Sequence, residues 1–217
     1  YKGIYDIDVR FSDGTLVKTE SSILTKGCVR NPNQPTICGI GYSGIGKYSS
    51  KNNKKAYQAW RSIFFRCYES LDSNPTYRGC YISKAWYNFQ NFAEWFENNS
   101  VVGWELDKDI LVPNNKEYGP ETCCFVPVEL NVLFRNKKKS NSNLPSGIAK
   151  LNSGRYQVNS SFRGTNIYLG SFDSVEDAQS AHKYFLKTKL CILLDEHFES
   201  MSDRLRRRLY HFIYSED

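Results

Sequence analysis

The 217-residue chain lacks any apolar run of the roughly 20 residues that a membrane-spanning helix needs. Its first residues, 1 to 8, also lack the basic and then apolar pattern of a signal peptide. We therefore expect a protein of the cytoplasm with no membrane contact. A hydrophobic content of 40%, with 15% aromatic residues, predicts packed cores rather than disorder.

Cys-x-x-Cys pairs, which structural zinc sites commonly use, are absent although the chain has seven cysteines. Their odd number and scattered positions favour reduced, buried thiols. A zinc site drawn from Cys67, Cys80 and Cys123 has no ligand spacing to support it, so we do not expect zinc. Histidine is scarce as well, because the first of the three histidines is His182.

Acidic residues outnumber basic ones only in the middle of the chain. Residues 1–55 and 135–217 are net basic, whereas residues 56–134 are net acidic. Basic segments on either side of an acidic one suit a protein whose two basic segments bind a polyanion and whose acidic segment between them supplies metal-binding carboxylates. Ordinary solvated surface charge explains the same distribution, so charge alone leaves both interpretations open.

The N-terminal half predicts a hairpin followed by helices. Residues 4–11 alternate apolar and polar, a turn follows at 12–15, and 16–22 are again strand-like, which predicts a small β-rich unit within residues 1–50. Apolar residues at helical spacing predict amphipathic helices at 56–68 and 85–96. Their aromatic side chains fit a core better than a base-stacking surface, because a small domain needs large side chains to fill its core.

Two strands and a helix are predicted next. Residues 105–111 and 122–126 are strand-like, a polar loop separates them, and a short helix begins at Val128. This is a ββα order, and it completes a central domain of residues 51–134. The polar, basic residues 135–145 predict a solvated linker.

The last domain, residues 146–217, predicts three short strands and then helices. Strands are expected near 147–150, 155–162 and 165–169, and an amphipathic helix capped by Ser174 is expected at 175–189. The whole chain is thus α+β in class. A final helical segment, 191–214, carries arginines that fit either a phosphate-binding cluster or a solvated side: Arg204, Arg206, Arg207 and Arg208.

Several motifs of the central segment, in order, resemble phage-borne proteins classed with the HNH homing endonucleases. The resemblance covers residues 40–134 and rests on 56–68, 86–96, 106–110 and 115–123. It implies a DNA endonuclease of homing or nicking type, dependent on Mg²⁺ or Mn²⁺, in the cytoplasm of the phage's host. The metal offsets charge on the phosphate, and a base deprotonates water.

The same resemblance implies roles for individual residues. Asp107 and Asn131 fall on the metal ligands of the family, and Thr122 falls on its middle Asn. Lys108 falls on the position of the catalytic His. The carboxylates on either side, Asp107 and Asp109, favour the charged ammonium, so Lys108 suits contact with the scissile phosphate better than proton abstraction. Asp109 would share a strand face with Asp107, which makes it a second metal ligand or the base.

The C-terminal segment resembles an APETALA2-type DNA-binding domain through residues 146–148, 154–156, 167–172 and 176–182. The resemblance implies a three-stranded sheet in the major groove of double-stranded DNA, with contacts from Lys150, Arg155, Gln157, Asn159, Ser161, Arg163 and Tyr168. Residues 157, 159 and 161 alternate along one strand and so share a face. Arginines of the plant pattern are replaced by Ala149, Leu151 and Ser161, so base specificity cannot be carried over.

Three classes of function remain open from the sequence. The first is a metal-dependent endonuclease, with phosphate contacts also from Arg61 and Arg66 of the first helix. The second is a DNA-binding protein that has lost catalysis and acts as a scaffold or regulator, for example against host defences. The third, a module that binds only protein, leaves the basic flanks unexplained, and the sequence indicates no particular protein partner. We favour the nuclease because the acidic pair and Asn131 occur together.

Overall fold

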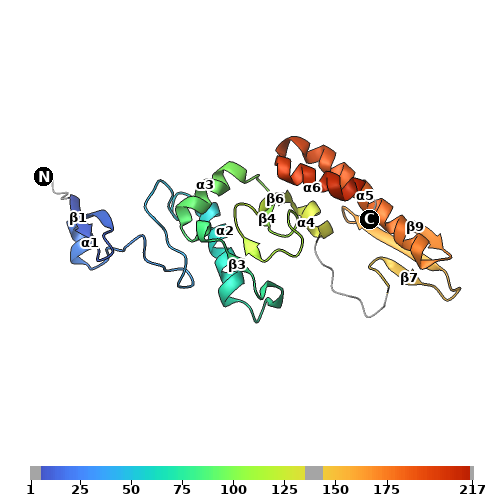
Figure 1. Ribbon diagram of the computed structural model, residues 1–217, viewed down its shortest axis with the longest axis horizontal. Coiled ribbons are helices and arrows are strands. Elements are labelled where there is room, and N and C mark those ends of the chain that lie inside the picture. Colours follow the sequence, from blue (N-terminus) through green and yellow to red (C-terminus); the bar gives the residue numbers. More distant parts are fainter. Residues whose placement is uncertain (1–5, 135–143, 216–217) are drawn as a thin grey trace. The chain divides into compact units, whose positions relative to one another are not determined.

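The computed structural model describes residues 6–134 and 144–215, and it is a mixed α+β structure, as predicted (Figure 1). Contacts divide the chain into two compact units. The N-terminal unit comprises residues 1–100 and 114–122, and the C-terminal unit comprises 101–113 and 123–217. Within the described ranges, no helix has the length and apolar character to cross a bilayer.

The N-terminal unit begins with the predicted hairpin. Strands β1 (Asp6–Arg10) and β2 (Leu16–Glu20) pair antiparallel, with Asp8 opposite Lys18. The turn between them needs Gly14, whose φ of 86° lies in the region that side chains disfavour. A short helix, α1 (Ser21–Thr25), follows β2 directly.

Aromatic side chains fill the core of the N-terminal unit. Helix α2 (Lys54–Phe64) continues into a π-helical turn at Phe65–Glu69, and α3 (Phe89–Asn99) follows a 3₁₀ turn at Lys84–Trp86. The indole Nε1 of Trp60 donates a hydrogen bond of 2.7 Å to the Trp86 carbonyl oxygen. Both predicted helices are confirmed, and the rings are core: those exposed by at most 1% are Trp60, Phe64, Trp86, Phe89 and Phe92.

Smaller elements complete this unit. A 3₁₀ turn at Pro75–Tyr77 leads to the two-residue strand β3 (Tyr81–Ile82). β3 pairs parallel with β5 (Glu117–Tyr118), which explains why residues 114–122 belong to the N-terminal unit.

The predicted ββα order is confirmed in the C-terminal unit. Strand β4 (Trp104–Asp107) pairs antiparallel with β6 (Cys124–Pro127), and α4 (Val128–Phe134) follows β6 directly. The first strand is shorter than the predicted 105–111. It ends at Asp107 because the Asp107 carboxylate accepts hydrogen bonds from the N–H groups of Asp109 and Ile110, which turns the chain.

Three strands and two helices form the rest of the C-terminal unit. β7 (Ile148–Lys150), β8 (Tyr156–Phe162) and β9 (Thr165–Phe172) make one antiparallel sheet in that order. Helix α5 (Val175–His197) is capped by Ser174, whose Oγ accepts the Asp177 N–H at 3.0 Å. It passes the predicted end at 189, and a 3₁₀ turn (Phe198–Ser200) separates it from α6 (Asp203–Tyr214).

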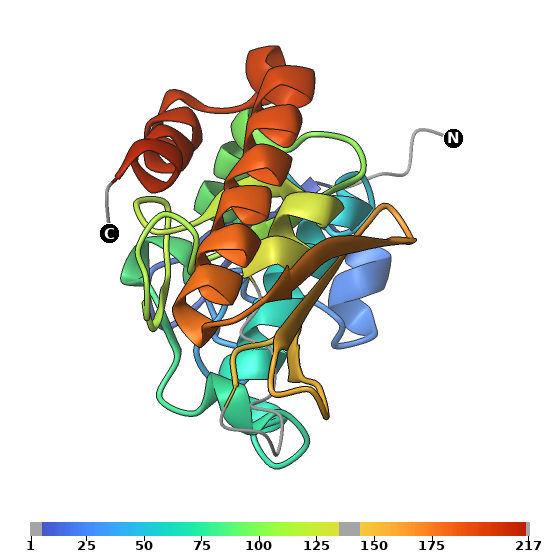
Figure 2. The ribbon, with the colours of Figure 1, turned by 90° about the vertical axis from the view of Figure 1, so that its right-hand side faces the viewer.

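One apolar core joins the ββα segment to α5 and α6. It includes Leu130 of α4, Leu190 and Leu193 of α5, and Leu205 and Leu209 of α6, all fully buried. Figures 1 and 2 show α4 beside α5. By contacts, the ββα segment thus belongs to the same unit as α5 and α6, whereas the predicted domains were 51–134 and 146–217. The physical reason is that two short strands and a short helix cannot bury a core alone. The predicted linker, 135–145, lies outside the described residues except for 144 and 145.

The shared core makes the ββα segment dependent on α6. We expect Leu209→Ala to lower the free energy of unfolding by about 2–5 kcal/mol, because it leaves a cavity in a fully buried site. Urea unfolding and amide hydrogen exchange measure this, and protection should fall in β4 and β6 as well as in α6. Ile192→Ala is the control, since Ile192 is 38% exposed on α5. Unchanged protection of β4 and β6 would contradict a shared core.

Candidate functional site

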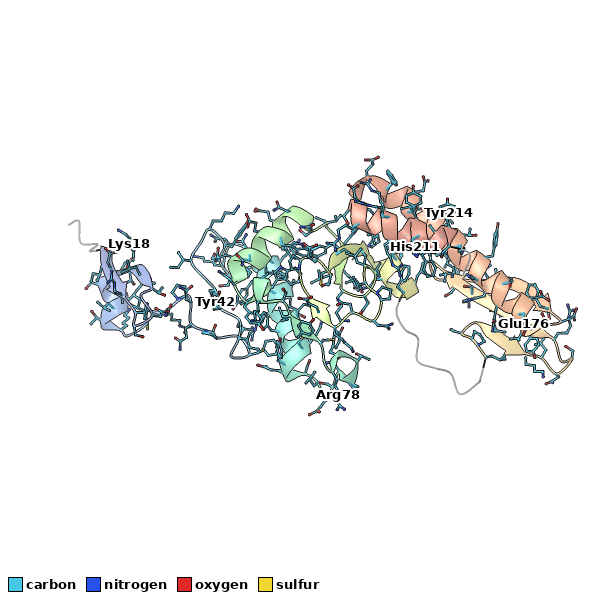
Figure 3. All side chains as sticks on the ribbon, in the orientation of Figure 1. Lys18, Tyr42, Arg78, Glu176, His211 and Tyr214 are labelled. Carbon is cyan, nitrogen blue, oxygen red and sulfur yellow. The ribbon has the colours of Figure 1, made fainter. Side chains whose placement is uncertain are left out.

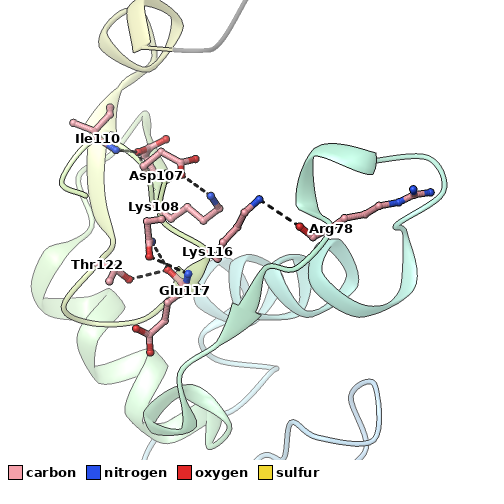
Figure 4. A network of polar contacts seen from close by, with 9 residues as sticks. Arg78, Asp107, Lys108, Ile110, Lys116, Glu117 and Thr122 are labelled. Carbon is pink, nitrogen blue, oxygen red and sulfur yellow. Dashed lines mark hydrogen bonds and ion pairs between the residues drawn. The ribbon is translucent and has the colours of Figure 1, made fainter. Parts of the chain in front are cut away.

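Asp107 ends β4 with its carboxylate fixed by the backbone. Its Oδ1 accepts hydrogen bonds from the N–H of Asp109 at 2.8 Å and of Ile110 at 2.7 Å (Figure 4). Burial raises the pKa of Asp107 above its ordinary value, and these two hydrogen bonds oppose the rise without cancelling it. Burial thus disfavours a negative charge on this carboxyl, and a bound cation would offset that cost.

Glu105 is a further candidate ligand, which the sequence analysis did not name. It lies two residues before Asp107 on β4, so both side chains leave the strand on one face. The amide Nδ2 of Asn131, only 9% exposed on α4, donates to Glu105 Oε2 at 2.6 Å. The sequence could have predicted that Glu105 and Asp107 share a strand face, because they are two residues apart. The contact with Asn131 could not be predicted, because it depends on how α4 packs on the strands.

Lys108 and Asp109 form an ion pair with each other. Lys108 is 7% exposed, and its Nζ lies 2.6 Å from Asp109 Oδ1. The Lys108 ammonium therefore donates to the Asp109 carboxylate. Asp109 does not share a strand face with Asp107, contrary to the prediction, because the strand ends at Asp107 and the chain turns there.

Residues 114–122 are organised by their own hydrogen bonds in the N-terminal unit. The Asn115 side chain donates to the Glu117 carbonyl and accepts its N–H, and Thr122 Oγ1 donates to the same carbonyl at 2.8 Å. Figure 4 also shows Lys116 donating to the Arg78 carbonyl. Thr122, which falls on the middle Asn of the HNH pattern, is therefore used to shape this loop.

A second set of potential ligands, not predicted from the sequence, could hold a metal ion. One ligand atom from each of Glu129, Glu196 and His197 lies within 4.8 Å of the others. Arg163 already provides positive charge there, since its guanidinium pairs with Glu129 at 3.3 Å and also with Glu196. These hydrogen bonds, to Glu196 and then Glu129, raise the pKa of Arg163. The set spans α4 and α5, so no sequence spacing marks it.

The predicted DNA-contacting residues are divided between surfaces. Gln157, Asn159 and Ser161 alternate along β8, and Tyr168, 62% exposed, is the partner of Asn159 on β9. Lys150 is the partner of Tyr156, so strand alternation puts it on the opposite face, with buried Val158.

The predicted arginines already have partners. Arg155 pairs with Asp173 at 2.9 Å and donates to the Ser171 carbonyl, while Arg163 lies in the turn between β8 and β9 and pairs with the two glutamates named above. In the N-terminal unit, Arg61 lies over the Phe65 ring and Arg66 over the Tyr77 ring. The polar face of the sheet therefore carries hydrogen-bonding groups, with arginines only at its margins.

Comparisons of the chain with protein families, with curated proteins and with solved structures give no match. A function for the chain therefore has to be inferred from the chemistry of its own residues.

The raised pKa of Asp107 predicts how stability varies with pH. The fold favours the protonated carboxyl, so this contribution is present below the ordinary pKa of 3.8 and is lost as the pH rises through the raised value. Asp107→Asn keeps an oxygen acceptor but removes the charge. We expect it to raise the urea midpoint at about pH 7 and to have little effect at about pH 3. Asp195→Asn, at an exposed position on α5, is the control; a lower midpoint for Asp107→Asn at neutral pH would contradict the prediction.

Proposed function

We propose that the chain is a DNA-binding protein that cuts phosphodiester bonds as an HNH-like endonuclease dependent on Mg²⁺ or Mn²⁺. One observation carries the proposal: Asp107 stands at the end of the first strand of a ββα segment whose helix supplies buried Asn131. The resemblance of residues 40–134 to phage HNH proteins agrees with it. The proposed location is the cytoplasm of a host cell.

Asp107 and Asn131, together with Glu105, are the residues that would hold the ion. Carboxylate and amide oxygens are the ligands that Mg²⁺ and Mn²⁺ prefer. Asn131 donates to Glu105 through Nδ2, and Oδ1 of the same planar amide is the atom that would bind the ion. When bound, the metal would neutralise charge on the phosphate and on the leaving oxygen.

Asp109 is the proposed base. Its side chain is 53% exposed, so water and substrate can reach it, and its carboxylate can accept the proton of the attacking water. Lys108, at 2.6 Å, orients that carboxylate and adds positive charge beside the phosphate. In this role Lys108 acts through charge and position rather than by proton transfer.

The polar face of the β7–β8–β9 sheet is the proposed surface for double-stranded DNA. Gln157, Asn159 and Ser161 present amide and hydroxyl groups on one face, which suits the edges of bases in the major groove. Tyr168 adds an exposed aromatic ring.

An HNH-like protein without catalysis, acting as a DNA-bound regulator, is the alternative. The Lys108–Asp109 ion pair favours it, because the proposed base is already paired with a cation of the chain. Such a protein would bind DNA in the same way but leave it uncut.

A plasmid assay separates the two proposals. With Mg²⁺ or Mn²⁺ we expect the purified chain to nick supercoiled DNA, and EDTA to stop it. Asp107→Ala should slow nicking by about 100-fold or more, since metal stabilisation of the transition state is worth several kcal/mol. Asp195→Ala should leave the rate unchanged. If the chain binds DNA but neither ion supports nicking on DNA from several sources, the inactive alternative holds.

A further inference from the structure

The two sides of helix α6 differ sharply in character. Leu205, Leu209 and Ile213 enter the apolar core and are at most 6% exposed. The residues on the opposite side form what we call the arginine–tyrosine face, and all are exposed: Arg204, Arg207, Tyr210, His211 and Tyr214. Figure 3 labels His211 and Tyr214 on this helix. Nothing in the proposed nuclease uses this face.

Three arginines of α6 divide between two roles. Arg206 pairs with Asp203 and donates to the Phe198 carbonyl, and Arg208 Nε donates to the Ile110 carbonyl at 3.0 Å. These two arginines secure the helix to its own unit. Arg207 is exposed, and its Nε donates to the Asp203 carbonyl oxygen of the same helix at 3.4 Å; it has no ion-pair partner in the part of the chain that the structure describes. Its charge is available to an anion.

Tyr210 and Tyr214 form an exposed aromatic platform one helical turn apart. Their ring centroids are 6.0 Å apart and the ring planes differ by only 18°. Tyr210 is 42% exposed and Tyr214 is 71% exposed. Two nearly parallel rings with an arginine beside them on the helix match the way proteins bind single strands, where aromatic rings stack on bases and cations contact the phosphates.

Helix α6, which carries the arginine–tyrosine face, is attached to the segment of the candidate metal site. Arg208 contacts Ile110, whose N–H is bound by Asp107. Cys124 is the strand partner of Asp107 and belongs to the same apolar core as Leu205 of α6. Helix α6 therefore packs against the segment that carries Asp107.

We propose that the arginine–tyrosine face of α6 binds single-stranded DNA, with Arg207 on a phosphate and with Tyr210 and Tyr214 stacked on unpaired bases. The proposal rests on the proposed DNA binding and adds a second surface to it. Bases within a duplex are already stacked on their neighbours, so they offer these rings no free face. The face would hold a strand that is unpaired near the cutting site.

Fluorescence anisotropy of labelled oligo(dT) with the full chain tests this, in EDTA so that no cutting occurs. We expect Tyr210→Ala/Tyr214→Ala to weaken binding by about 10- to 100-fold, and Tyr→Phe at both positions to restore it. Arg207→Gln should lower the slope of log affinity against log salt by about 0.7. Tyr184→Ala, which removes a ring that is 76% exposed on α5, is the matched control and should bind as the wild type does.

A duplex of equal length and oligo(rU) are the comparison ligands, and circular dichroism checks that each variant is folded. Tyr214→Ala alone, at the more exposed position, tests the platform should the double variant unfold. Unchanged oligo(dT) binding by the tyrosine variants would overturn the proposal, as would equal losses for the duplex or tighter binding of oligo(rU). Because the assay contains no metal, a failure to nick plasmid leaves this result intact, and nicking without oligo(dT) binding refutes only this inference.

Discussion

The apolar core shared by α4, α5 and α6 is the contact on which the C-terminal unit depends. Strands β4 and β6 have four residues each and α4 has seven, too few to be stable without further packing. Leu130 reaches this core from α4, and Val126 reaches it from β6. The positions of Asp107 and Asn131 are therefore set by leucines that lie more than 50 residues later in the chain.

A second constraint acts at the candidate site itself. The Asp107 carboxylate is fixed by two backbone N–H groups in a partly buried place, and Asn131 is fixed by Glu105. Such groups are ordered before any ligand arrives, so a ligand meets little entropic cost of arranging them. Asp109, by contrast, is exposed and is oriented by a neighbouring ammonium. The site thus combines a rigid part with a part open to solvent.

Local patterns predicted most of the elements. The hairpin, helices α2 and α3, the ββα order and the three-stranded sheet all follow from apolar periodicity within short windows. The end of β4 was misplaced because a side chain that binds its own backbone ended the strand. Lys150 was grouped with Gln157 because the sequence does not show which strand faces pair. Glu129, Glu196 and His197 were missed because only the packing of α4 and α5 brings them together.

The ion pairs of Arg163 have a consequence for geometry. They tie the turn between β8 and β9 to α4 through Glu129 and to α5 through Glu196, while Lys189 of α5 donates to Ser160 and Ser161 of β8. These contacts fix the three-stranded sheet to the ββα segment. If the chain reads DNA with this sheet and cuts it beside Asp107, as proposed, the distance between the recognised bases and the cut would be constant.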